Sequence, residues 1–334
     1  MSVRQATLER LASFPNVTMT QGIPLSRCTR FGIGGPAEVY FETSDESSFA
    51  ALLAAVRESG TNYVVIGGGT NLIVADEGFE GIVLRFTASA IDRSGQIVRA
   101  RAGAELQALV DFSIEQGLKG LETMTGIPGS VGGAIYGNAG AYGHSIDERV
   151  RLVRFFDGGR VRRFTNAECE FRYRESIFKK HKDWIVFEAE LAMDIAPVEE
   201  LRASAEKIFA IRLEKYPLTM KCAGSIFKNL LLAELSEGVR AQVPERVIRE
   251  GKVPSAYFLE QIGAKGMRIG DIRVADYHAN LIYNEGGGSA RQLCELIADL
   301  KQRVRVRFGL ELEEEVQYVG FTPGGVRRPS PILL

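Results

Sequence analysis

Two glycine-rich segments contain the residues most clearly suited to chemistry. The longer one runs from Gly117 to Gly143, and nine of its 27 residues are glycine. Glycine tolerates positive φ and lets the backbone approach a partner closely, and consecutive N–H groups in such turns form anion-binding concavities. Because leucine, isoleucine, valine and tyrosine are distributed through the segment, it is not a flexible linker. Its centre, Pro128–Ala134, is therefore interpreted as a loop that lies against a pyrophosphate.

The second segment is the turn Gly67–Asn71, which follows the apolar run Val64–Ile66 as a ligand loop follows a strand. It has neither the Gly-Lys-Ser/Thr of a Walker loop nor the GxGxxG spacing of a Rossmann turn. Either segment alone is more often structural than functional. Together they favour one extended ligand that contains a diphosphate, most simply a dinucleotide.

Seven short motifs, in their order along the chain, resemble the UDP-N-acetylenolpyruvoylglucosamine reductases of bacterial cell-wall synthesis. That family has an FAD-binding fold of the vanillyl-alcohol-oxidase type, and the resemblance runs from about Pro24 to Gly320. The motifs are Thr29–Gly35, Gly67–Asn71, Thr125–Ala134, Tyr173–Ser176, Gly224–Asn229, His278–Asn280 and Leu312–Val316.

The resemblance implies a flavoenzyme with non-covalently bound FAD and with NADPH as the source of electrons. Its reaction reduces the enolpyruvyl ether of UDP-N-acetylglucosamine-enolpyruvate to the lactyl ether of UDP-N-acetylmuramate, a peptidoglycan precursor. Hydride from flavin N5 is expected to reach the vinyl carbon, so negative charge develops on the carbon that bears the carboxylate. The protein must therefore place cations and a proton donor near the flavin.

Arg174, in the motif Tyr173–Ser176, is the expected clamp for that carboxylate and the stabiliser of the enolate-like intermediate. A guanidinium stays charged at all working pH values and grips a carboxylate at two points. Taken alone, Arg174 would be read as a surface arginine, because Arg172, Lys179 and Lys180 lie close to it in the sequence. Its catalytic role rests on the resemblance.

Ser225 matches the family's proton donor, and Glu315 matches its active-site carboxylate. A serine hydroxyl becomes a reasonable acid only beside a strongly basic carbanion. The run Glu313–Glu315 alone would indicate a solvated surface, but in an extended chain its first and third side chains share one face. One of these two acids can thus reach Arg174, and the resemblance selects Glu315.

The resemblance also implies ligand contacts. Backbone N–H groups of both glycine segments are expected at the pyrophosphate and the ribityl group, with Thr125, Gly126 and Ile127 beside the isoalloxazine. The expected cofactor residues are Gly67, Gly68, Gly69, Thr70, Asn71, Thr125, Gly126, Ile127, Pro128, Gly129, Ser130, Gly132, Gly133 and Ala134. The expected substrate residues are Tyr173, Lys228, Asn229, Tyr257, Gln261, His278 and Asn280.

Family members differ in whether an extra segment carries a tyrosine that folds over the substrate. The interval from Arg174 to Ser225 is too short for that segment, so the chain resembles the second type, and another group must cover its site. Leu230 also departs from the proline that commonly follows Phe-Lys-Asn in the family. Two alternatives stay open: an FAD-dependent oxidase acting on an alcohol or sugar, and a non-catalytic nucleotide-binding module.

Composition bounds the remaining possibilities. A net charge of −1 over 334 residues gives no electrostatic footprint for nucleic acid or an anionic membrane. No run approaches the roughly 20 apolar residues that span a bilayer. The four cysteines lack disulfide or CxxC spacing, and the three histidines lie too far apart in sequence to suggest a metal site. We expect a cytoplasmic protein with a small-molecule substrate, no nucleic-acid or membrane partner and, by default, a monomeric state.

The expected fold is α+β (mixed α/β), with a two-lobed FAD-binding domain and a smaller α+β substrate-binding domain. The expected parts are residues 1–86 and 87–216 for the two lobes, 217–320 for the substrate domain and 321–334 for a tail, with the Glu315 segment returning to the site. Periodicity and capping residues predict helices near the N-terminus and over 44–60, 104–116, 201–216, 255–261 and 289–308. Strands are predicted over 63–67, 81–86, 91–101, 150–156, 159–165, 184–193 and 279–283.

Overall fold

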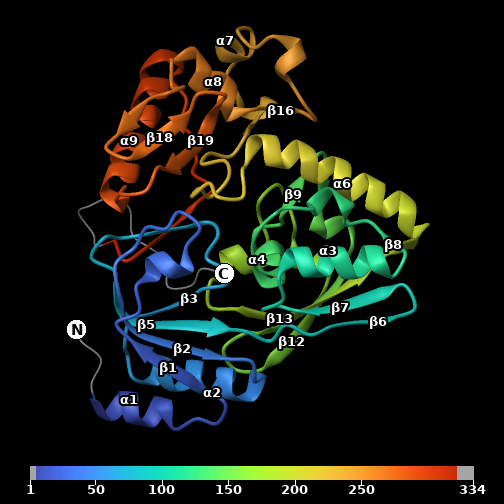
Figure 1. The fold of residues 1–334 in the computed structure, drawn as a ribbon, viewed down its shortest axis with the longest axis vertical. Coiled ribbons are helices and arrows are strands. Elements are labelled where there is room, and N and C mark those ends of the chain that lie inside the picture. Colours follow the sequence, from blue (N-terminus) through green and yellow to red (C-terminus); the bar gives the residue numbers. More distant parts are fainter. Residues whose placement is uncertain (1–4, 322–334) are drawn as a thin grey trace.

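The computed structural model describes residues 5–321, which form three bodies around a common centre (Figure 1). We call them the first lobe, the second lobe and the third domain. The first four residues and all of the expected tail except Phe321 lie outside the described part. Phe321 itself packs against Tyr318, with ring centroids 5.5 Å apart.

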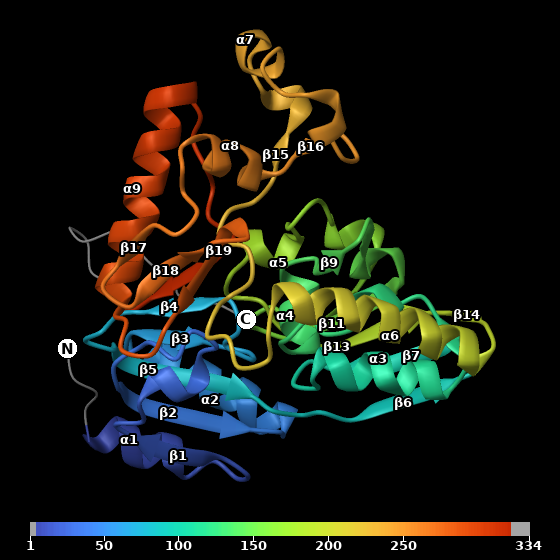
Figure 2. The ribbon, with the colours of Figure 1, turned by 45° about the horizontal axis from the view of Figure 1, so that its top comes forward.

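The first lobe is a four-stranded sheet in the order β1-β2-β5-β3, with α1 and α2 packed on it (Figure 2). β2, β5 and β3 run parallel, and β1 is an antiparallel edge strand. The helix expected over 44–60 is confirmed, and Asp45 caps it by accepting from the Ser48 N–H at 2.7 Å. The elements are α1 (Gln5–Ala12), β1 (Thr18–Gln21), β2 (Ala37–Thr43), α2 (Glu46–Glu58), β3 (Tyr63–Val65), β4 (Leu72–Val74) and β5 (Phe79–Phe86).

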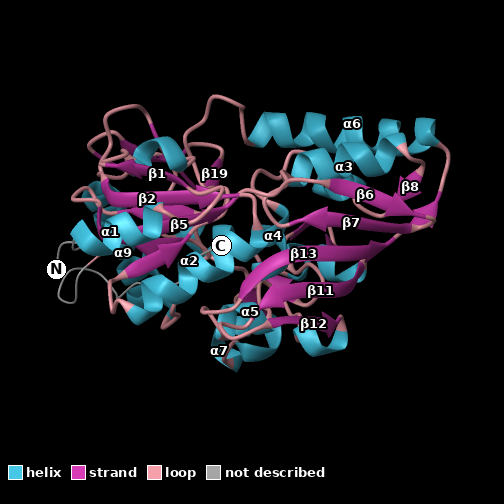
Figure 3. Cartoon of the chain, turned by 90° about the horizontal axis from the view of Figure 1, so that it is seen from below, coloured by secondary structure: helices cyan, strands magenta, loops and turns pink. Residues whose placement is uncertain are grey.

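The second lobe is a five-stranded antiparallel sheet in the order β12-β11-β13-β7-β6. The strands predicted over 150–156, 159–165 and 184–193 are present, but a simple meander of the three is wrong, because β11 and not β12 lies between the other two. Helices α3 and α6 run side by side along the lobe (Figure 3). The elements are β6 (Ile91–Ser94), β7 (Ile97–Arg101), α3 (Leu106–Glu115), α4 (Val131–Tyr136), β11 (Val150–Phe156), β12 (Val161–Thr165), α5 (Ile177–Lys180), β13 (Ile185–Ala192) and α6 (Val198–Lys215). Short pairs join β8 (Leu118–Lys119) to β14 (Asp194–Ile195) and β9 (Gly140–Ala141) to β10 (His144–Ser145).

The two lobes share one hydrophobic core. Phe49 and Phe86 of the first lobe lie 6.1 and 4.9 Å from Phe187 of the second, measured between ring centroids. At the edge of this core, the Glu46 carboxylate pairs with Arg101 and Arg154 of the second sheet. These aromatic contacts and the pairing of Glu46 with two arginines hold the lobes together as one unit.

The third domain is a small antiparallel sheet, β17-β18-β19, with α8 and α9 packed on it. Serine 289 and Gln292 form a capping box at the start of α9, and Gly309 ends the helix in a left-handed conformation. A segment with β15, α7 and β16 projects from this domain (Figure 2). The elements are β15 (Leu230–Leu231), α7 (Glu237–Arg240), β16 (Lys252–Val253), α8 (Ser255–Gln261), β17 (Arg268–Ile269), β18 (Ile272–Ala275), β19 (His278–Asn284) and α9 (Ala290–Phe308).

Single-turn 3-10 helices occupy several connections. They are η1 (Leu25–Cys28), η2 (Glu122–Met124), η3 (Ile146–Glu148), η4 (Ala167–Cys169), η5 (Leu232–Glu234) and η6 (Glu245–Val247). The glycine-containing segment 262–270 includes β17, which pairs with β18 and forms an edge of the third sheet.

A strand near residue 318 returns to the first lobe. β20 (Gln317–Val319) pairs in parallel with β4 of the first lobe. Nearby, the Asp76 carboxylate accepts hydrogen bonds from the N–H groups of Ala290 and Arg291, at 2.7 and 3.0 Å, and thereby caps α9 from another part of the chain. Both contacts fix the third domain against the first lobe.

Replacing Asp76 with alanine should lower the free energy of unfolding by about 1–2 kcal/mol, because two N–H groups in the first turn of α9 and the positive end of its dipole lose their acceptor. Urea unfolding followed by circular dichroism measures the change. Glu77→Ala is the matched control, since it removes an exposed carboxylate one residue away, and it should change stability by less than about 0.5 kcal/mol. Equal effects in both variants would contradict the capping role.

Candidate active site

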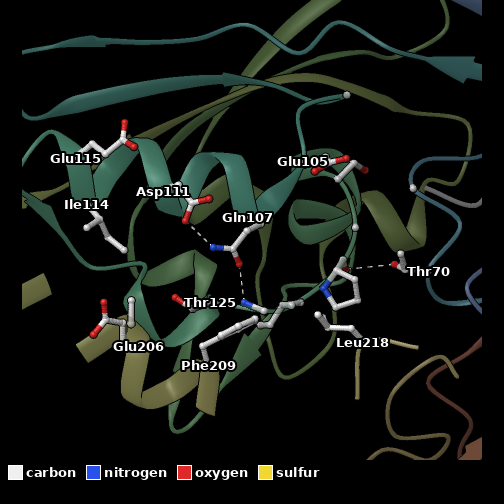
Figure 4. A pocket seen from close by; sticks show the side chains of 18 of the residues that line it. Thr70, Glu105, Gln107, Asp111, Ile114, Glu115, Thr125, Glu206, Phe209 and Leu218 are labelled. Carbon is white, nitrogen blue, oxygen red and sulfur yellow. Dashed lines mark hydrogen bonds between the residues drawn. The ribbon is translucent and has the colours of Figure 1, made fainter. Parts of the chain in front are cut away.

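Three connected cavities run through the centre of the molecule. The first, of about 800 Å³, lies between α3 and α6, and we call it the α3–α6 cavity (Figure 4). The central cavity, of about 460 Å³, shares with it a wall made of Gly68, Thr70 and residues 127–130. The distal cavity, of about 920 Å³, shares residues 140–142, Tyr173 and Arg174 with the central one. A long ligand and a second molecule could thus lie end to end.

The two glycine segments meet at the wall between the first two cavities. A Cβ on Gly68 would lie 3.1 Å from the Cα of Gly129, and a Cβ on Gly129 would lie 2.9 Å from Oγ1 of Thr70. Gly69, at φ +66°, has no room at all for a side chain, because its Cβ would fall 1.7 Å from the carbonyl oxygen of Cys28. Glycine is therefore required for the loops to touch and to present bare backbone to a ligand.

Thr125 and Gly126 face the α3–α6 cavity. The N–H of Gly126 donates to Oε1 of Gln107 at 2.6 Å, and Nε2 of Gln107 donates to Asp111 at 2.7 Å (Figure 4). These bonds fix the loop to α3. Ile127, by contrast, lies at the junction and lines both cavities.

Arg174, Ser225 and Glu315 all line the central cavity, although they come from three distant parts of the chain. Arg174 donates from Nε to Glu315 Oε1 at 2.7 Å and from its terminal nitrogens to the carbonyl oxygens of Gly140, at 2.7 Å, and Asn138, at 3.3 Å. Its backbone takes a left-handed conformation, with φ +56°. The guanidinium is therefore held rigidly at the edge of the cavity.

Ser225 is placed by strand-like contacts with β19. It lies opposite Leu281 in an isolated antiparallel bridge, and the next N–H, that of Ile226, donates to the Asn280 carbonyl at 3.1 Å. The buried Asn280 amide accepts from the Phe227 N–H at 2.9 Å and donates to its carbonyl at 2.8 Å. Among the described residues, the Ser225 hydroxyl has no hydrogen-bond partner, so it is available to a ligand.

The alternation expected for the three acids is confirmed. Glu313 pairs with Lys228 at 2.6 Å, and Glu315 pairs with Arg174 of the second lobe at 2.7 Å. Glu314 points the other way and pairs with Lys301 of α9 at 2.8 Å. This settles the geometry that places Glu315 next to Arg174.

Asn71 links the first glycine turn to the same segment. Its side chain donates to the Glu315 carbonyl at 2.8 Å, and its own carbonyl accepts from the Gln317 N–H at 2.9 Å. The first glycine turn and the Glu315 segment are therefore positioned together.

The expected substrate residues separate into two groups. Tyr173, Asn229, His278 and Asn280 line the distal cavity, and the hydroxyl of Tyr173 accepts from the Asn229 N–H at 3.2 Å. Lys228, Tyr257 and Gln261 line none of the three cavities. Tyr257 donates its hydroxyl to the Gln242 carbonyl at 2.8 Å, and Gln261 is exposed at the end of α8.

The ammonium of Lys228 is already engaged by two carboxylates, Glu175 at 2.7 Å and Glu313 at 2.6 Å. Burial works against its charge, but these two hydrogen bonds raise the pKa of Lys228. Lys228 therefore stays charged and stays bound to protein groups.

Sequence reasoning missed several polar residues of the central cavity, among them Lys179, Arg212, Lys215 and Tyr142. Arg212 is informative because its Nε is buried without a hydrogen-bond partner, and burial lowers the pKa of its guanidinium. The spacing of Arg212 and Lys215 on the predicted helix 201–216 is one available signal, since residues three apart share a helix face. The buried Tyr136 hydroxyl is similarly unpartnered, and burial raises its pKa.

The described residues also bear on membrane insertion and metal binding. No helix among residues 5–321 is long and apolar enough to cross a bilayer. Within the same range, no group of three or more histidine, cysteine, aspartate or glutamate side chains could hold a metal ion.

Comparison with known proteins relates this site to one family. Residues 37–164 match a family model described as an FAD-binding domain, and residues 216–319 match one described as the UDP-N-acetylenolpyruvoylglucosamine reductase C-terminal domain. A UDP-N-acetylenolpyruvoylglucosamine reductase from Solibacter usitatus is 63% identical over 311 residues, which cover 93% of this chain and 100% of the relative. One from Heliobacterium modesticaldum is 35% identical, with 91% of each chain covered.

A solved structure is similar over nearly the whole chain. The crystal structure of UDP-N-acetylenolpyruvylglucosamine reductase from Thermus caldophilus aligns with a TM-score of 0.70 and 28% identity. The alignment covers 91% of this chain and 98% of that one.

His278 should make the protein less stable in mild acid. Burial, reinforced by Lys215, lowers the pKa of His278 to about 4, below the value near 6.5 of an unfolded chain. The unfolded state therefore binds the proton first, so stability is unaffected above pH 6.5 and falls as the pH drops from 6.5 toward 4. After allowance for solvent screening, the loss at pH 5 is about 1–2 kcal/mol.

Urea unfolding at pH 7 and pH 5, for the wild type and His278→Gln, measures this effect. In the wild type, the Asn280 N–H donates a hydrogen bond to His278 Nδ1 at 3.1 Å. Glutamine at position 278 keeps an acceptor for this N–H. The variant should lose less stability than the wild type between the two pH values. Parallel losses would show that the ring is protonated as easily in the folded protein as in the unfolded chain.

Proposed function

The chain belongs to the family of UDP-N-acetylenolpyruvoylglucosamine reductases, and from this premise we propose how its three cavities divide the FAD and the substrate of that reaction. The activity is the FAD-dependent reduction of the enolpyruvyl ether in peptidoglycan precursor synthesis. The observation that carries the proposal is the convergence of Arg174, Ser225 and Glu315 on the central cavity, whose wall is the pair of glycine loops.

The residues present suit an FAD bound across the first two cavities. The contact between Gly68 and Gly129 leaves bare backbone where a pyrophosphate would lie, with Thr70 and Ser130 beside it. The isoalloxazine must lie where hydride can reach the substrate, so we place it in the central cavity. Gly133, Ala134 and Ile127 line that part and would contact it.

The adenosine then falls in the α3–α6 cavity. This revises the expectation that Thr125 and Gly126 lie beside the isoalloxazine, because both face the cavity that contains none of the three catalytic candidates. That cavity also has an apolar side, with Ile114, Phe209 and Leu218, against which a purine ring could pack. Ile127 keeps its place at the junction.

Bound FAD supplies the hydride that the protein itself cannot. Arg174 would grip the substrate carboxylate and stabilise the negative charge that develops beside it, and Glu315 keeps the guanidinium in that orientation. The Ser225 hydroxyl, free of other partners, would donate its proton to the carbon next to the carboxylate. NADPH would supply the electrons earlier in the cycle, by placing its nicotinamide in the same central cavity before the substrate enters.

The substrate's nucleotide part would extend into the distal cavity. Six cationic side chains line it, namely Arg172, Arg174, Lys215, Arg246, Arg249 and Lys252, against the two carboxylates Asp147 and Glu250. An excess of positive charge in a cavity attracts a diphosphate and holds it by charge-assisted hydrogen bonds. His278, kept neutral by burial, would contribute a hydrogen bond and no charge.

Three of these cations, Arg246, Arg249 and Lys252, lie on the projecting segment 231–252, which runs from the end of β15 to the start of β16. We call this segment the excursion. Arg246 and Arg249 are exposed and form no ion pair with any described residue. Glu250 reaches across to the β9–β10 hairpin, where a Cβ on Gly143 would lie 2.8 Å from its Oε1. The excursion is therefore the far wall of the distal cavity.

We assign the covering of the substrate to this excursion. Between Arg174 and Ser225 the chain forms only α5, β13, β14 and α6, which leaves no room for a tyrosine-bearing insertion and supports the second type of the family. Leu230, where a proline is common, begins β15 and pairs with Val253 at the base of the excursion. A strand residue there suits the start of a longer projecting segment. The nucleotide-linked substrate and NADPH also support a cytoplasmic location.

Ser225→Ala should bind FAD and be reduced by NADPH but should fail to return electrons to the enolpyruvyl substrate, because only the last step needs the hydroxyl proton. The measurement is the flavin absorbance band under anaerobic conditions, first with NADPH and then with UDP-N-acetylglucosamine-enolpyruvate. In the wild type the band should bleach and then recover. Recovery only with O₂ would favour the oxidase, and normal recovery in Ser225→Ala would remove serine as the proton donor.

Replacing Arg246 and Arg249 together with glutamine should raise KM for the enolpyruvyl substrate about tenfold or more while kcat changes little, because the lost contacts would be made to the diphosphate and not to the reacting carbons. Steady-state kinetics at fixed NADPH measure both constants. UDP serves as an independent probe of the cavity, and calorimetry should give a correspondingly weaker Kd.

Arg268→Gln is the matched control, since Arg268 is an exposed arginine of the third domain outside the three cavities. Its kinetics should match the wild type. In addition, trypsin should cleave after Arg246 and Arg249 more slowly when UDP is present. Equal cleavage with and without UDP, or unchanged KM in the double variant, would show that the excursion does not cover the substrate.

A further inference from the structure

Four charged side chains form a continuous chain between the second lobe and the third domain. Lys179 donates to Glu175 Oε1 at 3.0 Å, and Lys228 donates to the same oxygen at 2.7 Å. Lys228 continues the chain to Glu313 at 2.6 Å. The first two residues belong to the second lobe and the last two to the third domain, so Glu175 is the carboxylate that joins them.

Three of these four residues lie within three positions, along the sequence, of Arg174, Ser225 or Glu315. Glu175 follows Arg174 directly, Lys228 lies three residues after Ser225, and Glu313 lies two residues before Glu315. The two third-domain segments are themselves tied together, because the Lys228 N–H donates to the Glu313 carbonyl at 2.9 Å and the Glu315 N–H donates to the Ile226 carbonyl at 2.7 Å. A shift of Lys228 relative to Glu175 would therefore move Ser225 and Glu315 relative to Arg174.

Lys179 acts on the other side of the same joint. Its ammonium donates to the carbonyl oxygen of Arg174 at 2.7 Å. A non-glycine residue with φ near +56° is strained and persists only where its surroundings hold it. Lys179 thus fixes the backbone turn from which the Arg174 guanidinium extends.

The charges make Glu175 the critical member. The side chains of Lys179 and Lys228 are only 14% and 11% exposed, and both ammonium groups face one carboxylate oxygen. Burial and the nearby Lys228 lower the pKa of Lys179, and burial raises the pKa of Glu175 less than the hydrogen bonds from Lys228 and Lys179 lower it. Without the carboxylate, two poorly solvated ammonium groups would repel each other across the domain boundary.

We propose that Glu175 is a positioning residue, which sets the register of Ser225 and Glu315 against Arg174 by joining Lys179 and Lys228 across the domain boundary. Glu175 lines none of the three cavities. The inference rests on the proposed roles of the catalytic trio. Glu175 lies in the motif Tyr173–Ser176, but the resemblance assigned it no role, and the geometry of the trio depends on its carboxylate.

Stopped-flow absorbance of the FAD-loaded enzyme tests the proposal by separating the two half-reactions. In Glu175→Gln, reoxidation of the flavin by the enolpyruvyl substrate should slow about 10²-fold, since misplacing catalytic groups by about 1 Å costs that much. Reduction by NADPH needs none of the three residues in register, so it should change less than about threefold. Glu175→Asp, which keeps the charge, should recover most of the lost rate.

A double-mutant cycle shows whether the residues act as one unit. If they do, Glu175→Gln combined with Lys228→Met should be no slower than the slower single variant, whereas independent effects would multiply. Glu313→Gln, at an exposed side chain, breaks only the outer link and should show a smaller loss of the same kind even if Glu175→Gln folds poorly.

Glu46→Gln is the matched structural control, because Glu46 also joins two cations across a boundary, Arg101 and Arg154, but far from the trio. It should lose stability and keep both rates. Equal slowing of both half-reactions in Glu175→Gln, multiplicative effects in the cycle, or failure of aspartate to restore the rate would overturn the proposal. If the enolpyruvyl substrate failed to reoxidise the reduced flavin of the wild-type enzyme, the proposed function itself would be rejected.

Discussion

The guanidinium of Arg174 is the point on which the rest of the site depends. Its hydrogen bonds reach the carboxylate of Glu315 and two carbonyl oxygens of the long glycine segment, so one side chain of the second lobe joins that segment to the Glu315 segment. Arginine suits this place because its planar fork offers several donors in fixed directions and stays charged. A lysine would satisfy at most part of this set. The glycine contacts and Asn71, in turn, hold the partners of Arg174 in place.

The glycines of the two turns contribute because they lack a Cβ atom, which lets the loops pack closely together. Side chains at Gly68, Gly69 or Gly129 would collide with neighbouring backbone or with Thr70. The first turn is then bound to the Glu315 segment through Asn71. The first glycine turn and the Glu315 segment are therefore parts of one rigid assembly, which suits the proposed reaction, in which hydride and proton must arrive at adjacent carbons.

Local features of the fold were predictable from the sequence because they depend on neighbouring residues. Asp45 and the Ser289–Gln292 box fix where α2 and α9 begin, and the structure confirms both helices. The opposite orientations of Glu313 and Glu314 also follow from an extended backbone alone. Period and capping carry this information within a few residues.

What could not be predicted are contacts between residues far apart in sequence. Periodicity does not say that Glu175 meets Lys228, 53 residues later, or that the Asn280 amide is used up by the backbone of Phe227. The convergence of the trio came from family resemblance, and its geometry from the structure. Tyr257 and Gln261 lie outside the cavities, because α8 directs the Tyr257 hydroxyl to the Gln242 carbonyl and leaves Gln261 exposed. Arg246 and Arg249 gave no local signal at all.

The pairing of β20 with β4 has a consequence for the order of folding. A parallel contact between residues near 72 and 317 closes a very long loop, and such contacts form late. During synthesis, the lobes can collapse around the Phe49, Phe86 and Phe187 rings before the third domain has been made. Glu315 precedes β20 by only two residues, so Arg174 lacks its carboxylate until almost the last described residue has emerged. A nascent chain thus holds folded lobes with an incomplete site, and the site is completed only with the last strand of the described residues.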